Sequence, residues 1–277
     1  MGCRSSSGRF CTRSARTPGV VIFGTGNVAT HLARGLYDAG VDIIQIFGRN
    51  PHAAAKLAHL TEAEVIDGVD KVVHDADLYI LAVSDSAVEA LASALPPVSG
   101  VVVHTAGSVP LSACAAHTNH FGVLYPLQTF SLGREISWEN VPIFIEADCD
   151  ASLQSIHEVA AYLSNQIHPL SSAHRMQLHL AAVFVANFVN HCYAAGYAIT
   201  TQNGLNPDWL HPLMQETLDK AVSLRNPLAG QTGPALRGNA EIISLHLSLL
   251  EQTPALRALY ESMSRSIFQL HHPDTST

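Results

Sequence analysis

The residues most suited to chemistry lie at 18 to 36, where an apolar run leads into glycines and then into a helical pattern. Val20 to Phe23 is predicted to be a buried strand. Gly24 permits a tight turn, Gly26 lets the backbone approach a diphosphate, and the small Ala29 allows close packing of helix on strand. The diphosphate would bind free N–H groups at the positive end of the helix. An ordinary glycine turn is the alternative, but the strand and helix on either side favour a dinucleotide site formed by Gly24, Thr25, Gly26, Asn27 and Val28.

The end of the second predicted strand, Val41 to Phe47, indicates which dinucleotide binds. An NAD site usually has an acidic residue there, whereas this strand is followed by Arg49 and Asn50. The guanidinium of Arg49 suits a 2′-phosphate and Asn50 could donate a hydrogen bond beside it, so we expect NADP. Asp42 lies at the wrong end of the strand. The alternative is that Arg49 is a solvated residue in the turn before Pro51.

Strands and helices alternate as far as about residue 170, which predicts a Rossmann-type, doubly wound parallel sheet of the α/β class. Ligands of such sheets bind at the carboxyl ends of the strands. The residues there are mostly small or polar, although each could equally be an ordinary turn residue. Further strands are expected at Leu78 to Val83, Val101 to His104, Gly122 to Tyr125 and Val141 to Glu146. Their ends add Val83, Ser84, Thr105, Ala106 and Gly107 to the predicted cofactor site and Tyr125 to Thr129 to its candidate walls.

From about Ser171 the pattern is helical only, which predicts a separate all-helical C-terminal domain. A long helix is expected from Ala173 to Gln202, before a stop at Asn203-Gly204. The predicted organisation is a flexible leader at 1–17, an NAD(P)-binding Rossmann domain at 18–170 and a helical substrate or dimerisation domain at 171–277. Further helices are expected from Asn206 to Leu224, from Ala240 to Glu251 and from Pro254 to Leu270.

Polar residues on the long helix are candidates for catalysis. His179 and Asn190 share a face of a regular α-helix, with Asn187 about a quarter turn away. On an otherwise apolar helix such groups need partners, in the fold or in a ligand. His179 could exchange a proton beside a nicotinamide and Asn187 could hold a substrate oxygen. The alternative for His179 is a core histidine bonded to a nearby carbonyl.

A loop at 231–239, rich in glycine, is the second candidate for substrate binding. Thr232, Arg237 and backbone N–H groups could bind a carboxylate or a phosphate there. The alternative is a connecting loop whose arginine makes a structural ion pair. No metal site is predicted, because histidines and carboxylates do not recur convincingly at helical spacing.

Composition narrows the class of protein. The 277 residues are 47% hydrophobic, carry a formal net charge of −8 and have a mean hydropathy of +0.17, as expected for a packed protein that does not bind nucleic acid. Five irregularly spaced cysteines favour a reducing, cytoplasmic location. The leader could instead be an N-myristoylation signal or a transit peptide, since it begins Met-Gly-Cys and is rich in Arg and Ser. Leu178 to Ile199 is interpreted as a buried helix and not as a membrane span, because it contains histidine and asparagine.

Several motifs in order along the chain resemble those of Rossmann-like NADP oxidoreductases that carry a helical second domain of unknown function. The resemblance covers nearly all of the chain after residue 18. It implies an architecture similar to pyrroline-5-carboxylate reductase, ketopantoate reductase and the 6-phosphogluconate dehydrogenase superfamily, with a helical domain that often builds a dimer. The motifs are Gly24 to Ala29, Phe47 to Asn50, Leu81 to Asp85, His104 to Ser108, Tyr125 to Thr129, His179 to Val183 and Thr232 to Gly238.

The resemblance does not fix the reaction. The β-hydroxyacid and ketopantoate enzymes have a catalytic lysine on the first long helix of the second domain, whereas Lys56, Lys71 and Lys220 all lie elsewhere. From the resemblance we expect an NADP-dependent reductase of a small carbonyl or imine substrate that bears a carboxylate. The nicotinamide would lie between the domains. Because the long helix has no lysine, we expect His179 to be the proton donor. A non-catalytic NADP-binding sensor or regulator on the same fold is the alternative.

Overall fold

The computed structural model describes residues 16–115 and 118–273. Nearly all of the predicted leader, residues 1–17, lies outside these ranges. The chain forms two compact units, Met1–Ala186 and Asn187–Thr277, whose internal structures are described separately. The predicted boundary between residues 170 and 171 stays a prediction.

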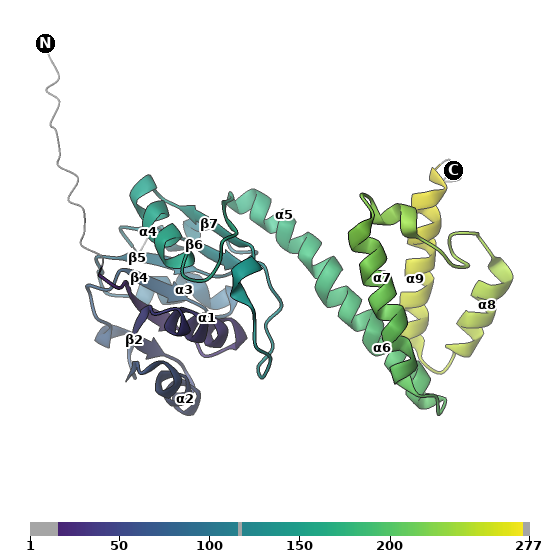
Figure 1. Cartoon of the computed structure of the whole chain (residues 1–277), viewed down its shortest axis with the longest axis horizontal. Coiled ribbons are helices and arrows are strands. Elements are labelled where there is room, and N and C mark those ends of the chain that lie inside the picture. Colours follow the sequence, from purple (N-terminus) through teal and green to yellow (C-terminus); the bar gives the residue numbers. More distant parts are fainter. Residues whose placement is uncertain (1–15, 116–117, 274–277) are drawn as a thin grey trace, which may run out of the picture. The chain divides into compact units, whose positions relative to one another are not determined.

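The first unit is built on an eight-stranded sheet with strand order β3-β2-β1-β4-β5-β6-β7-β8 (Figure 1). All neighbouring strands are parallel except β6 and β7, so the predicted Rossmann-type sheet is confirmed with one antiparallel pair added. The sequence did not predict β8, because Ile167-His168-Pro169 is short and has no alternating apolar pattern. The strands are β1 (Gly19–Phe23), β2 (Asp42–Phe47), β3 (Glu64–Ile66), β4 (Leu78–Leu81), β5 (Val101–His104), β6 (Phe121–Pro126), β7 (Ile143–Ala147) and β8 (Ile167–Pro169).

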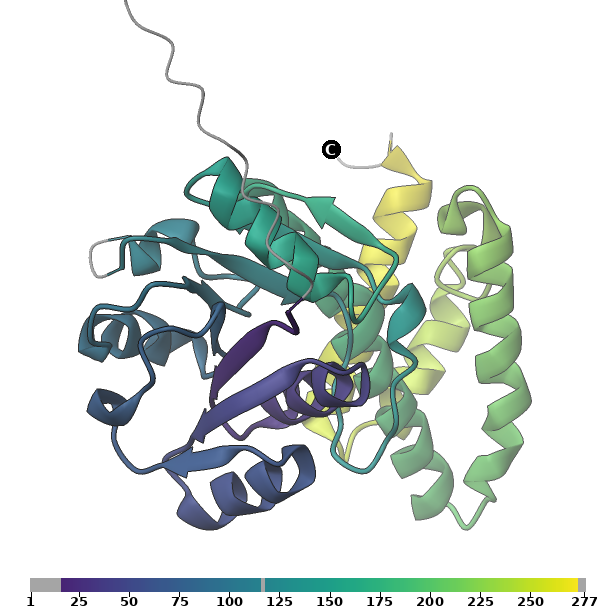
Figure 2. The same cartoon turned by 60° about the vertical axis from the view of Figure 1, so that its left-hand side comes forward.

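Helices cover both faces of this sheet (Figure 2). One core cluster joins one face of the strands to α1 (Asn27–Asp38), α2 (Pro51–Thr61) and α4 (Asp150–Ala160). A second cluster joins the other face to α3 (Val88–Ala94) and to a 3₁₀ turn at Leu111–Cys114. Residues of β1 and β4 are fully buried because both of their faces are covered, which explains their continuous apolar sequences.

After β8, the described residues form helices joined by loops, with no further strand. Its long helix contains 31 residues, Ser172–Gln202, and the boundary between the two units falls inside it. Three segments make up this helix: α5 (Ser172–Ala182), a π-helical stretch (Val183–Phe188) and α6 (Val189–Gln202). The second unit adds α7 (His211–Ser223), α8 (Ala240–Leu249) and α9 (Pro254–His271).

The exposure of the long helix corrects one expectation. We predicted that Leu178 to Ile199 would be buried, yet no residue from Val183 to Gln202 is buried in the single chain. Side chains as apolar as Phe184 and Val185 are 59% and 74% exposed. Length and composition alone would let this helix cross a membrane. Apolar surface of this helix is therefore available to a partner.

Candidate active site

A cavity of about 890 Å³ opens at the carboxyl ends of the parallel strands in the first unit. Residues from the ends of β1, β2, β4, β5 and β6 line it together with one residue of α5. Every residue predicted to contact the cofactor lies in its wall: Gly24, Thr25, Gly26, Asn27, Val28, Arg49, Asn50, Val83, Ser84, Thr105, Ala106 and Gly107. His179 and Tyr125 line the same cavity.

The glycine turn has the shape that a diphosphate needs. Gly24 has φ +125°, and a Cβ there would lie 2.1 Å from the carbonyl oxygen of Ala82, so both the backbone conformation and the packing require glycine. A Cβ on Gly26 would meet no protein atom within 4 Å, so the space in front of this residue is open. Gly26 is also the N-cap of α1, and no side chain caps the helix. The free N–H groups of α1 therefore face a space that an anion can enter.

Arg49 and Asn50 follow β2 directly and line the cavity. The side-chain oxygen of Asn50 accepts a hydrogen bond of 3.2 Å from the N–H of Ala53 and so caps α2. This bond leaves the amide nitrogen of Asn50 able to donate to a ligand. Arg49 is exposed and forms no ion pair with another described residue, so its guanidinium is available to a phosphate.

The ring of His179 packs closely against the backbone of the turn at Gly107. A Cβ on Gly107 would lie 2.6 Å from ring atoms of His179, so glycine allows the close approach. Nδ1 of His179 is 2.9 Å from the hydroxyl oxygen of Tyr125, and the two rings meet edge to face. Tyr125 is 7% exposed, and burial raises the pKa of its phenol. The pair therefore holds a neutral phenol against an imidazole at the wall of the cavity.

Tyr125 was expected in the wall of the site, but its pairing with His179 was not predicted. The sequence does contain a signal for Tyr125. It is the fifth residue of β6, close to the carboxyl end of the strand, where ligands of such sheets bind. The partner could not be known, since His179 is 54 residues away in the chain.

A buried ion pair fixes the start of α5 and thus the position of His179. Arg175, one helical turn before His179, is 1% exposed and its Nη1 donates to Oε2 of Glu146 on β7 at 2.6 Å. Nη2 donates to the carbonyl oxygen of Val109, at 2.5 Å. Both the N–H and the hydroxyl of Ser172 donate to the same Glu146 carboxylate. Partial burial alone would raise the pKa of Glu146, but the hydrogen bonds from Ser172 and Arg175 outweigh it and lower the pKa.

His104, at the end of β5, shapes the neighbouring turn. Its side chain is fully buried, and its Nδ1 accepts a hydrogen bond of 3.3 Å from the N–H of Ala106. Burial, together with the nearby charge of Arg175, lowers its pKa to about 4. His104 is therefore neutral at physiological pH and supports Thr105 to Gly107 as a fixed hydrogen-bond acceptor.

The loop after β6 is tied to the start of α1. The amide nitrogen of Asn27 donates to the carbonyl oxygen of Phe130 at 2.9 Å, and Nε2 of His31 lies 3.0 Å from that of Ser131. The ring of Phe130 contacts His31 and also lines the cavity. This loop therefore borders the region where the diphosphate is expected.

The other predicted catalytic residues, Asn187, Thr232 and Arg237, belong to the second unit, and all are exposed. The expectation that Asn187 and Asn190 follow His179 around a regular α-helix is wrong. The π-helical stretch Val183–Phe188 contains Asn187 and precedes Asn190, so the angular phase changes after His179. The catalytic and substrate-binding roles of Asn187, Thr232 and Arg237 stay predictions.

Comparisons with known proteins agree with this geometry. Residues 19–106 match the family described as "NADP oxidoreductase coenzyme F420-dependent", and residues 141–267 match a domain of unknown function, DUF2520. A Bacteroides fragilis protein described as an NADP oxidoreductase is 38% identical, and the match covers 91% of this chain and 98% of that chain with a TM-score of 0.85.

Two further relatives are more distant. Pyrroline-5-carboxylate reductase of Pseudomonas aeruginosa is 32% identical over 105 residues, and this match spans 36% of the present chain and 38% of that reductase. A reductive aminase from Aspergillus terreus, solved with NADPH4, cyclohexanone and allyl amine, shares the fold at 16% identity and a TM-score of 0.63, with 91% of this chain and 90% of the aminase covered. The glycine turn, the cavity and these matches together show that the chain belongs to the NADP oxidoreductases in which a Rossmann-type domain precedes a DUF2520 domain.

Proposed function

We propose that the protein is an NADPH-dependent reductase that acts on a small carbonyl or imine substrate bearing a carboxylate. The observation that carries the proposal is the single cavity that combines the glycine turn, the cation after β2 and the pair of Tyr125 and His179. NADPH supplies a hydride when bound, and the protein's own residues hold and orient the reactants.

Cofactor binding is proposed because groups in the cavity wall match the charged parts of NADPH. The turn at Gly24 to Asn27 and the N-terminus of α1 would bind the diphosphate. Arg49 and the amide nitrogen of Asn50 would bind the 2′-phosphate, which selects NADP over NAD. Val83, Ser84 and the turn from Thr105 to Gly107 line another part of the cavity and would contact the rest of the cofactor.

His179 would give a proton to the reacting centre, and Tyr125 would hold its ring. If the phenol oxygen of Tyr125 accepts from Nδ1–H, a doubly protonated imidazole can release the proton on Nε2 and remain as a neutral ring. Arg175 and Glu146 act as positioning residues, because their ion pair fixes α5 one turn away. This assignment lets a histidine serve where the long helix has no lysine.

For the substrate we propose that Arg237 and Thr232 bind the carboxylate and that Asn187 orients the reacting group. An exposed guanidinium and a hydroxyl near glycine N–H groups are suited to a small acid. We further propose a cytoplasmic homodimer that does not insert into a membrane. The many exposed apolar side chains of the second unit support the dimer, since a second copy of the same surface would cover them.

Cofactor titration is the first test. Binding of NADPH and NADH is followed by nicotinamide fluorescence in the wild type and in Arg49→Ala. We expect the wild type to prefer NADPH and the variant to lose roughly tenfold or more in NADPH affinity, with NADH affinity unchanged, because one charged hydrogen-bonding partner contributes about 1.5 to 3 kcal/mol. Failure to bind either dinucleotide would contradict the proposal.

Turnover is then measured on keto acids and cyclic imines, each paired with its analogue lacking the carboxylate. His179→Gln should lower kcat strongly, whereas Arg237→Ala should raise KM only for the carboxylate-bearing member of each pair. Lys220→Ala is the matched control, because that cation has no assigned role. Tight NADPH binding with no turnover of any substrate would favour a cofactor sensor.

A further inference from the structure

A second group of side chains capable of chemistry lies at the edge of the sheet opposite the cavity. The antiparallel register of β6 and β7 pairs Gly122 with Ala147. The residue before β6, His120, is therefore brought next to Asp148 and Cys149, which follow β7. Because β6 runs parallel to β5, this end of the pair lies at the amino-terminal edge of the parallel strands, away from the carboxyl ends that line the cavity.

The donor atoms of the three side chains lie close together. Nδ1 of His120 is 3.7 Å from Oδ2 of Asp148, and these atoms and Sγ of Cys149 all lie within 4.8 Å of one another. In a tetrahedral zinc site, with bonds of about 2.0 to 2.3 Å, ligand atoms are separated by about 3.5 Å. The 3.7 Å between Nδ1 of His120 and Oδ2 of Asp148 is close to this separation.

The backbone around the group is well fixed. The N–H of Asp148 donates to the carbonyl oxygen of Phe121 at 3.0 Å, and Oδ1 of Asp148 accepts from the N–H of Phe121 at 3.3 Å. The second oxygen of Asp148, Oδ2, faces the ring of His120. Cys149 is the N-cap of α4, and its Sγ lies 3.3 Å from Oγ of Ser152.

The donor set selects the metal. Mg²⁺ and Ca²⁺ bind oxygen ligands, whereas a thiolate, an imidazole and a carboxylate together suit Zn²⁺. Three protein ligands also leave one tetrahedral position for water or an added ligand. We propose that His120, Asp148 and Cys149 form a Zn²⁺ site at the amino-terminal edge of the sheet. None of these residues was predicted as a ligand, because they are not at helical spacing.

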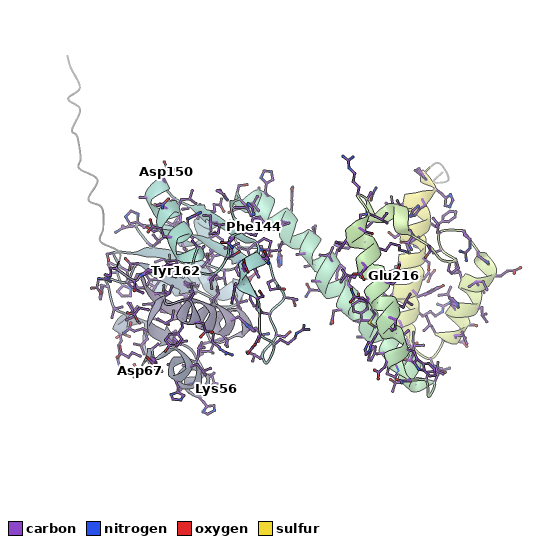
Figure 3. All side chains as sticks on the ribbon, in the orientation of Figure 1. Lys56, Asp67, Phe144, Asp150, Tyr162 and Glu216 are labelled. Carbon is purple, nitrogen blue, oxygen red and sulfur yellow. The ribbon has the colours of Figure 1, made fainter. Side chains whose placement is uncertain are left out.

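A hollow beside the group supports the proposal independently. His120 and Ser152 line a space of about 930 Å³, whose wall extends along α4 as far as Tyr162. Figure 3 labels Tyr162 and also Asp150, the first residue of α4 and the neighbour of Cys149. Carboxylates in this wall raise the local concentration of cations, and a hollow gives water or a small anion access to a fourth position on the metal. The titratable residues of the wall besides His120 are Arg16, Asp75, Asp77, His157, Glu158 and Tyr162.

The experiment uses the full chain and Co²⁺ as a spectroscopic probe. Cys3 and Cys11 lie outside the described residues, so both are replaced by serine in every variant, the reference protein included. A thiolate ligand gives Co²⁺ a sulfur-to-metal charge-transfer band, and a tetrahedral site strengthens its visible bands. Zn²⁺ is then titrated against bound Co²⁺ to obtain its affinity. Melting curves of the metal-free proteins confirm that each variant folds.

We expect the reference protein to show the charge-transfer band and to bind Co²⁺ with one equivalent per chain. Cys149→Ser should abolish the band, and His120→Gln and Asp148→Asn should each weaken Zn²⁺ binding at least about tenfold. Cys192→Ser and His157→Gln are the matched controls and should change neither result. NADPH binding should be the same in all variants, since the cavity lies at the other edge of the sheet.

Three outcomes would overturn the proposal. The first is no charge-transfer band in the folded reference protein. The second is a band that survives in Cys149→Ser, and the third is Zn²⁺ affinity that does not change in His120→Gln and Asp148→Asn, which would mean a surface thiolate binding metal alone.

Discussion

The two units of this chain bury their apolar residues to very different extents. The first unit encloses two clusters of buried side chains, one on each face of its sheet. Among the described residues of the second unit, only Ala235 is buried, although the unit is rich in leucine and other apolar residues. Side chains such as Val222 and Leu249 are 77% and 74% exposed there. The second unit therefore exposes a large apolar surface and buries few side chains of its own.

The difference indicates which unit depends on a partner. Fully burying a leucine or valine contributes about 1.5 to 3 kcal/mol, and the first unit obtains this stabilisation within one chain. The second unit can obtain it only from another surface. Homodimers commonly use the same patch of both copies, so the exposed helices would complete each other's core.

The largest expected effect concerns that surface. Val222→Asp and Leu249→Asp, made separately, should convert the proposed dimer to a monomer, because each places a charge in the shared apolar contact. The measurement is molar mass by light scattering. Leu132→Asp, at a leucine of the first unit that is 63% exposed, should leave the mass unchanged. A wild-type protein that is monomeric at micromolar concentration would contradict the proposed dimer.

The next effect compares one ion pair from each unit. Glu146→Gln leaves the buried guanidinium of Arg175 without its charged partner and should lower the free energy of unfolding by about 3 kcal/mol. The matched change in the second unit is Glu261→Gln, which breaks an exposed pair with Arg265 and should cost less than about 1 kcal/mol. Urea unfolding of both variants gives the two values. Equal losses of unfolding free energy in the two variants would show that the buried pair of Glu146 and Arg175 stabilises the protein no more than an exposed pair does.

The last effect is a pH dependence of the first unit, which is absent at neutral pH and reaches its full size only below about pH 4. The pKa of His104 is lowered from 6.5 to about 4 in the folded protein, so the unfolded chain binds a proton first as the pH falls. His104 therefore contributes stability that is present at pH 7 and is lost between about pH 6.5 and 4, to a limit of about 3 kcal/mol.

The pH dependence is checked by measuring the free energy of unfolding at several pH values in the wild type and in His104→Asn. Asparagine keeps an acceptor for the N–H of Ala106 and does not titrate, so the loss on acidification should be smaller than in the wild type. His52→Asn, at an exposed histidine of α2, is the control and should follow the wild-type curve. Parallel curves for the wild type and His104→Asn would show that His104 does not carry this dependence.

Much of the cofactor cavity could be predicted from local sequence. Gly24 and Gly26, Arg49 and the residues from Thr105 to Gly107 all follow predicted strands, and parallel strands bring their carboxyl ends to one edge. The strand β7 was expected, but its antiparallel direction could not be predicted, because the apolar pattern of a strand does not show which way it pairs. The short β8 has no alternating apolar pattern. The domain boundary and the substrate-binding roles of Thr232 and Arg237 stay predictions.

The sequence by itself determined the alternation of strands and helices, the glycine turn and the placement of small or polar residues at strand ends. These features depend on neighbours in the chain, whose spacing is visible in the sequence. Only the tertiary structure decided that Tyr125 meets His179, that Glu146 pairs with Arg175 and that His120 lies beside Cys149. Each of these contacts joins residues that are 29 or more positions apart, and such partners depend on the register of strands and the docking of a helix on them.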